Sequence, residues 1–246
     1  MNTFGKKYGQ VFLSDKNIAA KEIRELDIQE GEKILEIGPG HGILTETLLK
    51  NNIFLTAVEP DHRFFDELSE RYSKNILDGK FKIVKDSFLN IENDHYDKII
   101  GNIPYNLSSK IIFKILDFDF DMAVIMVQKE FAKRLVAKPG SKDYSRLTVN
   151  ANVRSDVRLS FTVSRRSFFP PPDVDSAVVA IVKKKYDIDI IEFDKFLIDM
   201  FSKRRKKIST IIKNYSGPLK DKRPYELNIK ELTEIFYCHY RRHSPF

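Results

Sequence analysis

The residues with the clearest potential for chemistry are Asn102-Ile103-Pro104-Tyr105, which follow two apolar residues and a glycine, Ile99-Ile100-Gly101, at the end of a predicted buried strand. A strand that ends in Asn-x-Pro-Tyr would bring together an amide oxygen, a backbone carbonyl and a flat ring. Pro104 favours an extended conformation for Ile103 and has no N–H of its own, so the Ile103 carbonyl is the expected second acceptor. Such a site could hold a planar base that carries an exocyclic amine, with Tyr105 stacked on the base for ~1–3 kcal/mol.

This arrangement predicts methyl transfer to an adenine N6 amine. The N6 lone pair is delocalised into the ring, so the amine is a poor nucleophile. If Asn102 Oδ1 and the Ile103 carbonyl accept its two hydrogens, the nitrogen becomes more pyramidal and its lone pair can point at a donor methyl. The base must be single-stranded or flipped out to enter. Positioning and electrostatics would carry the catalysis, and no metal is expected.

A glycine-rich loop, Glu36-Ile37-Gly38-Pro39-Gly40-His41-Gly42, is the candidate donor site because it joins a predicted strand to a predicted helix. Its Gly-x-Gly-x-Gly spacing differs from the dinucleotide fingerprint, and no Gly-Lys-Ser/Thr follows, which excludes a P-loop. Glu59 ends the next predicted strand and could accept both ribose hydroxyls. Asp86 ends the third and could accept from an adenine amine. A carboxylate that binds ribose, as proposed for Glu59, would suit NAD as well as S-adenosylmethionine. An amide at the end of the fourth strand favours S-adenosylmethionine as the ligand. Each feature alone could instead be a ligand-free turn or a solvated strand end.

The elements around these residues predict an α/β fold. Nearly apolar strands alternate with helices, which is typical of a parallel sheet covered on both faces. The predicted strands are 33–37, 54–59, 81–86, 96–102 and 122–128, and the predicted helices are 15–26, 43–50, 61–72, 108–116 and 129–135. Residues 5–15 are expected to form a loop or short turn.

The pattern changes after Pro139-Gly140. Two strand-like segments are predicted at 147–153, which could begin as helix, and 157–163. An irregular extended loop at 165–172 and a strand at 175–182, antiparallel to its neighbour, follow. From Phe193 the pattern is helical, with a last helix at about 229–236. We therefore expect a domain boundary near 184–190.

Composition limits the function classes. The chain has 246 residues, a net charge of +7 and a pI of about 9.2, which favour a polyanionic partner, although a lysine-rich proteome would give the same values. The single cysteine, Cys238, rules out an internal disulfide and disfavours a cysteine metal site. No signal peptide or membrane span is visible, so a cytoplasmic protein without a membrane partner is expected. The five histidines show no ligand spacing and are expected on the surface.

Basic runs could form a phosphate-binding surface, with a solvated helix face as the alternative interpretation. The densest run, residues 203–207, is predicted to lie in a helical region. The other runs are Arg165-Arg166, residues 183–185 and Arg241-Arg242.

Taken together, the motifs resemble those of the rRNA adenine N6-dimethyltransferases of the KsgA type, in their archaeal or eukaryote-like branch. Residues 102–105 match the family's Asn-(Leu/Ile)-Pro-Tyr motif. Residues 9–13 resemble its Gln-Asn-Phe-Leu segment, with Val11 where asparagine is usual, so a side-chain contact there is in doubt while a backbone contact would survive. Residues 127–132, 139–147 and 168–177 look like further family blocks, the last resembling Phe-x-Pro-Pro-Pro-x-Val-Asp-Ser-Ala. The similarity extends over most of residues 5–185.

The resemblance implies a Rossmann-like class I S-adenosylmethionine-dependent methyltransferase domain, residues 1–185, and a small all-helical RNA-docking domain, residues 186–246. It implies dimethylation of two adjacent adenosines in the loop of the 3′-terminal helix of small-subunit rRNA, during small-subunit biogenesis. The partner would be the small ribosomal subunit or its precursor rRNA, and we expect a monomer.

The resemblance also assigns site residues. Phe168, not Phe169, would be the second aromatic beside the base. The expected residues are, for catalysis, Asn102, Ile103, Pro104, Tyr105 and Phe168; for the cofactor, Gln10, Val11, Leu13, Gly38, Gly40, Glu59, Asp86, Ser87 and Asn102; and for RNA, Arg165, Arg166, Lys203, Arg204, Arg205, Lys206 and Lys207.

Two alternatives stay open at this point. One is a large-subunit rRNA methyltransferase of the antibiotic-resistance type, against which the blocks at 139–147 and 168–177 argue. The other is an RNA-binding ribosome assembly factor with a methyltransferase fold, against which the intact Asn102, Tyr105 and donor loop argue.

Overall fold

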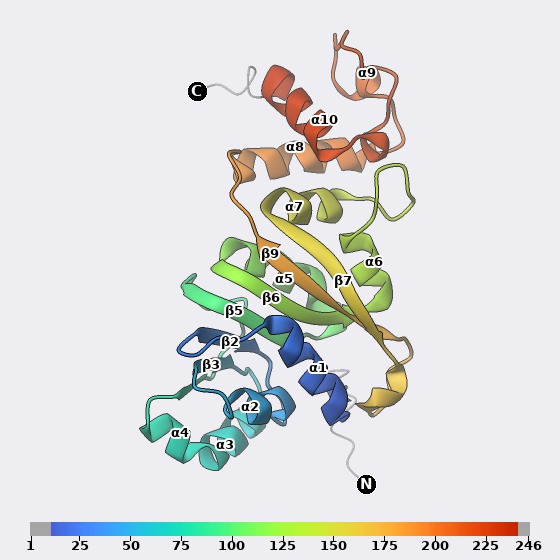
Figure 1. Cartoon of the computed structure of the whole chain (residues 1–246). Coiled ribbons are helices and arrows are strands. Elements are labelled where there is room, and N and C mark those ends of the chain that lie inside the picture. The colour runs from blue at the N-terminus through green and yellow to red at the C-terminus, as the bar shows by residue number, and fades with distance from the viewer. Residues whose placement is uncertain (1–10, 241–246) are drawn as a thin grey trace. The chain divides into compact units, whose positions relative to one another are not determined.

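The computed structural model describes residues 11–240, and in it the chain divides into two compact units (Figure 1). The first comprises described residues 11–132 and 157–183, and the second comprises 133–156 and 184–240. The division expected at residue 185 assigned 133–156 to the first domain, whereas their contacts group them with the second unit. The segment 133–156 lies between elements of the first unit in the sequence, so a linear boundary could not have separated it.

Within the described residues, a seven-stranded sheet forms the centre of the first unit, with strand order β4-β3-β2-β5-β6-β9-β7. The first five of these strands pair in parallel, and β9 pairs antiparallel with β6, as the sequence predicted. Parallel strands place their carboxyl ends at one edge of the sheet, where ligands bind in open α/β folds. The strands are β2 (Lys33–Ile37), β3 (Phe54–Val58), β4 (Phe81–Val84), β5 (His95–Asn102), β6 (Asp119–Gln128), β7 (Ser155–Val163) and β9 (Ser176–Lys183).

Helices cover both faces of this sheet, and Figure 1 shows α1 and α5 on opposite sides. The N-cap of α1 is Asp15, whose carboxylate accepts the N–H groups of Asn17 and Ile18. The helices of this region are α1 (Lys16–Leu26), α2 (Ile43–Leu48), α3 (His62–Arg71), α4 (Ser73–Leu77), α5 (Ser108–Asp117) and α6 (Lys129–Leu135), with short 3₁₀ turns η2 (Tyr105–Leu107) and η3 (Arg165–Ser167).

A second, two-stranded sheet joins distant parts of the sequence. Strand β1 (Phe12–Leu13) pairs antiparallel with β8 (Phe168–Phe169), with Phe12 opposite Phe169 and Leu13 opposite Phe168. Ser14 adds two hydrogen bonds to the Ser167 carbonyl, from its N–H and its hydroxyl. The segments expected to be a loop at 5–15 and an irregular loop at 165–172 therefore each contribute a short strand.

The second unit is helical from residue 184 to 240, as expected, with its own apolar core. Its helices are α7 (Arg146–Arg154), α8 (Ile190–Ser202), α9 (Ile208–Ile211), η4 (Pro224–Glu226), α10 (Ile229–Ile235) and η5 (Phe236–Tyr240).

The expectation of a strand-like segment at 147–153 was wrong, because these residues form α7. Ser145 and Thr148 form a capping box that starts the helix. Most of its side chains are buried, including Thr148 and Asn150, so the helix has no polar face and the apolar residues at alternate positions resembled a strand.

Candidate active site

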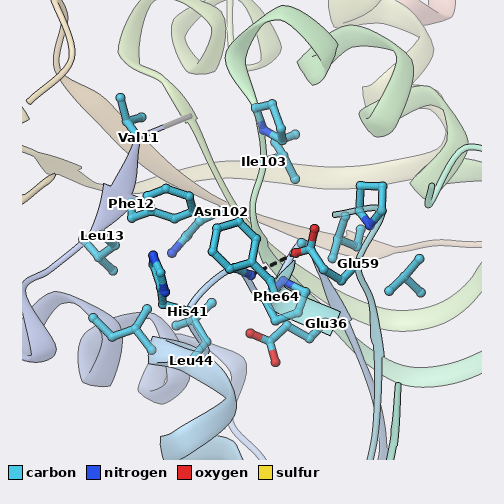
Figure 2. A pocket seen from close by; sticks show the side chains of 18 of the residues that line it. Val11, Phe12, Leu13, Glu36, His41, Leu44, Glu59, Phe64, Asn102 and Ile103 are labelled. Carbon is cyan, nitrogen blue, oxygen red and sulfur yellow. Dashed lines mark hydrogen bonds between the residues drawn. The ribbon is translucent and has the colours of Figure 1, made fainter. Parts of the chain in front are cut away.

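A cavity of about 340 Å³ lies at the carboxyl ends of β2, β3 and β5 in the first unit (Figure 2). This volume is in the usual range for small-molecule sites. It brings together most of the residues that the sequence proposed for the donor and the base. Those that line it are Val11, Leu13, Gly38, Gly40, Glu59, Ser87, Asn102, Ile103, Pro104 and Tyr105.

The key feature of the cavity is an unpaired acceptor on Asn102. Its Oδ1 is buried and has no hydrogen-bond partner among the described residues. Buried polar atoms normally have partners, so an unpaired amide oxygen on a residue that lines the cavity points to a donor that the described residues do not supply. The amide is positioned by β5, whose last residue, Asn102, pairs with Met126 of β6.

The backbone after Asn102 leaves one carbonyl available. The Ile103 N–H donates to the Met126 carbonyl at 3.3 Å. The Pro104 carbonyl accepts from the Leu107 N–H at 3.0 Å and from the Ser108 hydroxyl at 3.3 Å. Because the Ile103 carbonyl has no donor among the described residues, it can accept a second hydrogen from a bound amine.

Tyr105 is held by its hydroxyl, which lies 2.7 Å from the Ser176 hydroxyl at the start of β9. Burial raises the pKa of Tyr105 above its usual value, so the ring stays neutral. A neutral phenol fixed at its oxygen end offers a face on which a base can stack.

The donor loop fits a nucleoside with a ribose and a charged tail. Gly40 has φ +54°, and a Cβ there would come within 3.0 Å of the Phe12 ring. Glu59, buried, accepts the Gly40 N–H at 3.0 Å and the Asp61 N–H at 2.9 Å, which orients its carboxylate in the cavity wall. Each carboxylate oxygen can accept more than one hydrogen bond, so ribose hydroxyls can still bind.

Glu36 is a second buried carboxylate of the cavity. Its Oε2 accepts the Thr45 hydroxyl at 2.7 Å, and its Oε1 has no hydrogen-bond partner among the described residues. Burial raises the pKa of Glu36 to about 7, and the nearby Glu59 acts in the same direction. Buried acids beside the glycine loop suit a cationic ligand, and S-adenosylmethionine carries a sulfonium and an ammonium group.

An aromatic group beside the loop was missed by the sequence reasoning. The rings of Phe12, His41 and Phe64 meet edge-on in pairs with centroids 4.7–5.2 Å apart, and all three line the cavity (Figure 2). His41 was expected to be a surface residue; it is exposed but also forms part of this wall. In the sequence, the aromatic residue types are the only sign of this group, because the fold and not the spacing brings Phe12 and Phe64 together.

The second aromatic of the base site differs from the expectation. Phe168 is 6% exposed and belongs to the apolar core, whereas Phe169 is 76% exposed and lines the cavity. Successive side chains of a strand point to opposite faces, so β8 can direct only one of the two rings to the cavity. The structure therefore places Phe169, and not the Phe168 expected from the motif alignment, in the cavity lining, and Phe169 is the candidate.

One predicted cofactor residue, Asp86, does not join the site as expected. Asp86 is absent from the cavity lining, because β4 ends at Val84 and the Asp86 carboxylate binds the Ser87 N–H and the Asn90 amide in the following turn. Ser87 and Phe88 line the cavity instead. Gln10 lies outside the described residues.

The predicted RNA-binding cations separate into paired and unpaired groups. We call residues 203–207 the basic turn, since they form a turn between α8 and α9 and not part of a helix. Arg204 donates to the carbonyls of Lys142 and Ser141 and lies over the Tyr225 ring, and Lys207 pairs with Asp221 at 2.8 Å. The basic-turn side chains that are exposed and form no ion pair with a described residue are Lys203, Arg205 and Lys206.

The other basic runs are also divided. Arg165 and Arg166 are exposed in η3, directly before β8, and the Arg165 guanidinium donates to the Asp173 carbonyl at 3.4 Å. Lys183 donates to the Leu116 and Phe118 carbonyls, and Lys184 pairs with Asp156, so these two serve the fold. Arg241 and Arg242 lie outside the described residues. Within residues 11–240, no helix has the length and apolarity that a membrane crossing requires, and no group of three or more metal-ligating side chains gathers.

Comparison with known proteins places this site in a family. The family model described as Ribosomal RNA adenine dimethylase matches residues 1–243. Proteins named Ribosomal RNA small subunit methyltransferase A are similar: that of Malacoplasma penetrans is 42% identical over 85% of this chain and 78% of its own length, and that of Borreliella afzelii is 39% identical over 94% and 86%. The relative from Pyrococcus furiosus, whose name is the same but preceded by "Probable", is 38% identical. This identity is no higher than that of the other two relatives, so membership of the archaeal or eukaryote-like branch stays a prediction.

Solved structures agree with the fold. A dimethyladenosine transferase from Plasmodium falciparum superposes with a TM-score of 0.83 at 28% identity, over 92% of this chain and 96% of that one. The 23S rRNA methyltransferase ErmE superposes with a TM-score of 0.70 at 24% identity, over 91% and 98%, which supports the fold alone. From the family match and the extent of these similarities, the chain belongs to the ribosomal RNA adenine dimethylase family.

Proposed function

We propose that this protein transfers methyl groups from S-adenosyl-L-methionine to N6 of two adjacent adenosines in the loop of the 3′-terminal helix of small-subunit rRNA. The product would be N6,N6-dimethyladenosine, formed during small-subunit biogenesis. The family membership and the names of the relatives support an rRNA adenine substrate and the small subunit.

The single observation that carries the proposal is the buried Oδ1 of Asn102 without a partner, beside a free Ile103 carbonyl. Two acceptors match the two hydrogens of an exocyclic amine. Tyr105 and Phe169 are the aromatic rings of the same cavity that could contact the base faces. Holding both hydrogens orients the nitrogen lone pair, so binding and activation of the amine are the same event.

The residues around the glycine loop would hold the methyl donor. Glu59 would accept the ribose hydroxyls, Gly38 and Gly40 would let the backbone approach closely, and Glu36 would favour the positive end of the ligand. S-adenosyl-L-methionine supplies an electrophilic methyl on a sulfonium. The aromatic group of Phe12, His41 and Phe64 would exclude water from that side of the cavity.

The exposed cations would bind the phosphate backbone of the RNA. Arg165 and Arg166 precede Phe169 by a few residues in the first unit, which supports a contact close to the target base. The unpaired cations of the basic turn would add a second contact. We propose that the enzyme works as a monomer in the cytoplasm, on the small ribosomal subunit or its precursor rRNA.

Incubation with labelled S-adenosyl-L-methionine and unmethylated small or large ribosomal subunits tests the proposal. We expect label only in small-subunit rRNA, recovered as dimethyladenosine at two adjacent positions near the 3′ end. Label in large-subunit rRNA would indicate the antibiotic-resistance type of enzyme. Binding to subunits without any label would indicate an assembly factor, and either result would overturn the proposal.

A further inference from the structure

The cavity itself offers no strong cation to the RNA phosphates that must lie near it. None of the described residues that line it is a lysine or an arginine, and two of them, Glu36 and Glu59, are acids. The target adenosine enters only after it leaves its stack, so the phosphates on either side of it come to lie outside the cavity, close to its opening. Contacts that fix these phosphates must therefore come from residues next to the lining.

Lys129 is such a residue, and a series of contacts joins it to the base site. The Tyr105 hydroxyl lies 2.7 Å from the hydroxyl of Ser176. Ser176 pairs with Gln128, the last residue of β6, and Lys129 follows Gln128 directly. The Lys129 N–H donates to the Asp175 carbonyl at 3.0 Å. Lys129 therefore leaves the sheet next to the strand position that holds the ring proposed to stack on the base.

The charge of Lys129 is loosely paired. Its Nζ lies 3.6 Å from Oδ2 of Asp175, beyond hydrogen-bond reach, and the two side chains are 37% and 44% exposed. Exposed ion pairs of this kind contribute little to stability. The other oxygen of the same carboxylate, Oδ1, accepts the Arg165 N–H at 3.2 Å. Asp175 thus contacts both Lys129 and the turn η3, which carries the exposed Arg165 and Arg166.

We propose that Lys129 binds a backbone phosphate beside the target adenosine, and that Asp175 competes with this phosphate for the Lys129 ammonium group. This proposal rests on the proposed function. A lysine binds phosphate as a point charge on a flexible stem, so its ammonium can exchange a carboxylate at 3.6 Å for a closer phosphate without a change in the backbone. The competing carboxylate weakens contacts with RNA in other registers, so it favours the phosphate that the bound base places correctly.

The test measures affinity for unmethylated small subunits at several salt concentrations, together with KM and kcat for methyl transfer. Lys129→Gln removes the cation, and Lys129→Arg retains one. Asp175→Asn removes the competing charge but keeps an oxygen for the Arg165 N–H. The matched controls are Lys50→Gln and Glu46→Gln, because Lys50 and Glu46 also form an exposed pair at 3.6 Å and do not line the cavity. Each control changes the net charge as much as the variant that it accompanies.

We expect Lys129→Gln to lower the affinity about 3- to 10-fold and to reduce the slope of log affinity against log salt concentration by about 1, since one phosphate contact is lost. KM should rise while kcat stays within about twofold, because this contact is equally strong in the ground state and the transition state. Asp175→Asn should raise the affinity about threefold or more, and this gain should be absent in a Lys129→Gln background. Lys129→Arg and both controls should stay within about 1.5-fold of wild type.

An affinity and a slope in Lys129→Gln equal to those of Lys50→Gln would overturn the proposal and leave Lys129 in a surface pair alone. Weaker binding by Asp175→Asn than by wild type would overturn it as well, because the carboxylate would then position η3 and not compete with RNA. If urea unfolding shows that Lys129→Gln does not fold, the affinity of Asp175→Asn relative to Glu46→Gln decides. Failure of wild type to bind or methylate small subunits would instead refute the proposed function.

Discussion

The assignment of Phe169 as the second aromatic of the base site leads to a sharp prediction for two adjacent residues. Phe169 is 76% exposed, so Phe169→Ala should change the free energy of unfolding by no more than about 0.5 kcal/mol. Loss of a base stack is worth ~1–3 kcal/mol, which corresponds to a decrease of about 5- to 150-fold in kcat/KM for the RNA.

Phe168 should behave in the opposite way. It is 6% exposed in the core, so Phe168→Ala should cost about 3–5 kcal/mol of stability. Phe168→Leu keeps an apolar core side chain and gives a folded protein for kinetics, with kcat/KM expected near that of wild type. Phe54→Ala is the control for loss of an exposed ring, because Phe54 begins β3 at the edge of the sheet opposite the cavity.

Urea unfolding and methyl-transfer kinetics on small subunits, measured on the same preparations, separate the two roles. An unchanged kcat/KM in Phe169→Ala would refute the role of this ring. A loss of kcat/KM in Phe168→Leu, with stability close to that of wild type, would restore the assignment made from the sequence motif.

Three further predictions concern charge and backbone. Burial raises the pKa of Glu36 from 4.5 to about 7, so the folded state binds this proton more tightly than the unfolded state does, and the free energy of unfolding should fall by about 3 kcal/mol as pH rises through that window. In urea unfolding at several pH values, Glu36→Gln should make the free energy of unfolding less dependent on pH. A pH dependence equal to that of wild type would contradict the raised pKa. Gly40→Ala should weaken donor binding about tenfold or more, as measured by calorimetry. The control is Gly79→Ala, because Gly79 has a similar positive φ but lies outside the cavity, and this variant should leave donor binding unchanged. Equal effects of the two substitutions would contradict a close approach of the Gly40 backbone to the donor. Replacing the three unpaired cations of the basic turn by glutamine should reduce the slope of log affinity for RNA against log salt concentration by about 2–3. Arg204→Gln should instead lower the free energy of unfolding and leave this slope unchanged. The reverse result would contradict the division into paired and unpaired cations.

The first unit could be predicted from the sequence because its signals are local. Buried parallel strands are continuous apolar runs, and residues such as Asp15 and Gly38 mark where helices and turns begin. The carboxyl ends of parallel strands share one edge, so naming the strands also placed Glu59 and Asn102 together. Family membership followed from the same motifs.

The errors arose where the deciding contact joins distant residues. Whether Phe168 or Phe169 faces the cavity depends on how β8 pairs with β1, more than 150 positions earlier in the chain. The dense basic run gave no sign that Arg204 binds the carbonyls of Ser141 and Lys142. Helix α7 lacked a polar face because it is buried on nearly all sides, which removed the period that identifies a helix.

The most direct test of the account is the single-turnover methyl-transfer rate of Asn102→Ala, measured with its affinity for S-adenosyl-L-methionine. If Oδ1 of Asn102 accepts a hydrogen of the target amine, the rate should fall about 100- to 1,000-fold, the range for loss of one preorganised polar group at a reacting centre. Donor affinity should stay within about threefold of wild type, because Glu59 and the glycine loop remain intact. Donor binding that collapses together with the rate, or a rate that stays near wild type, would contradict the central claim.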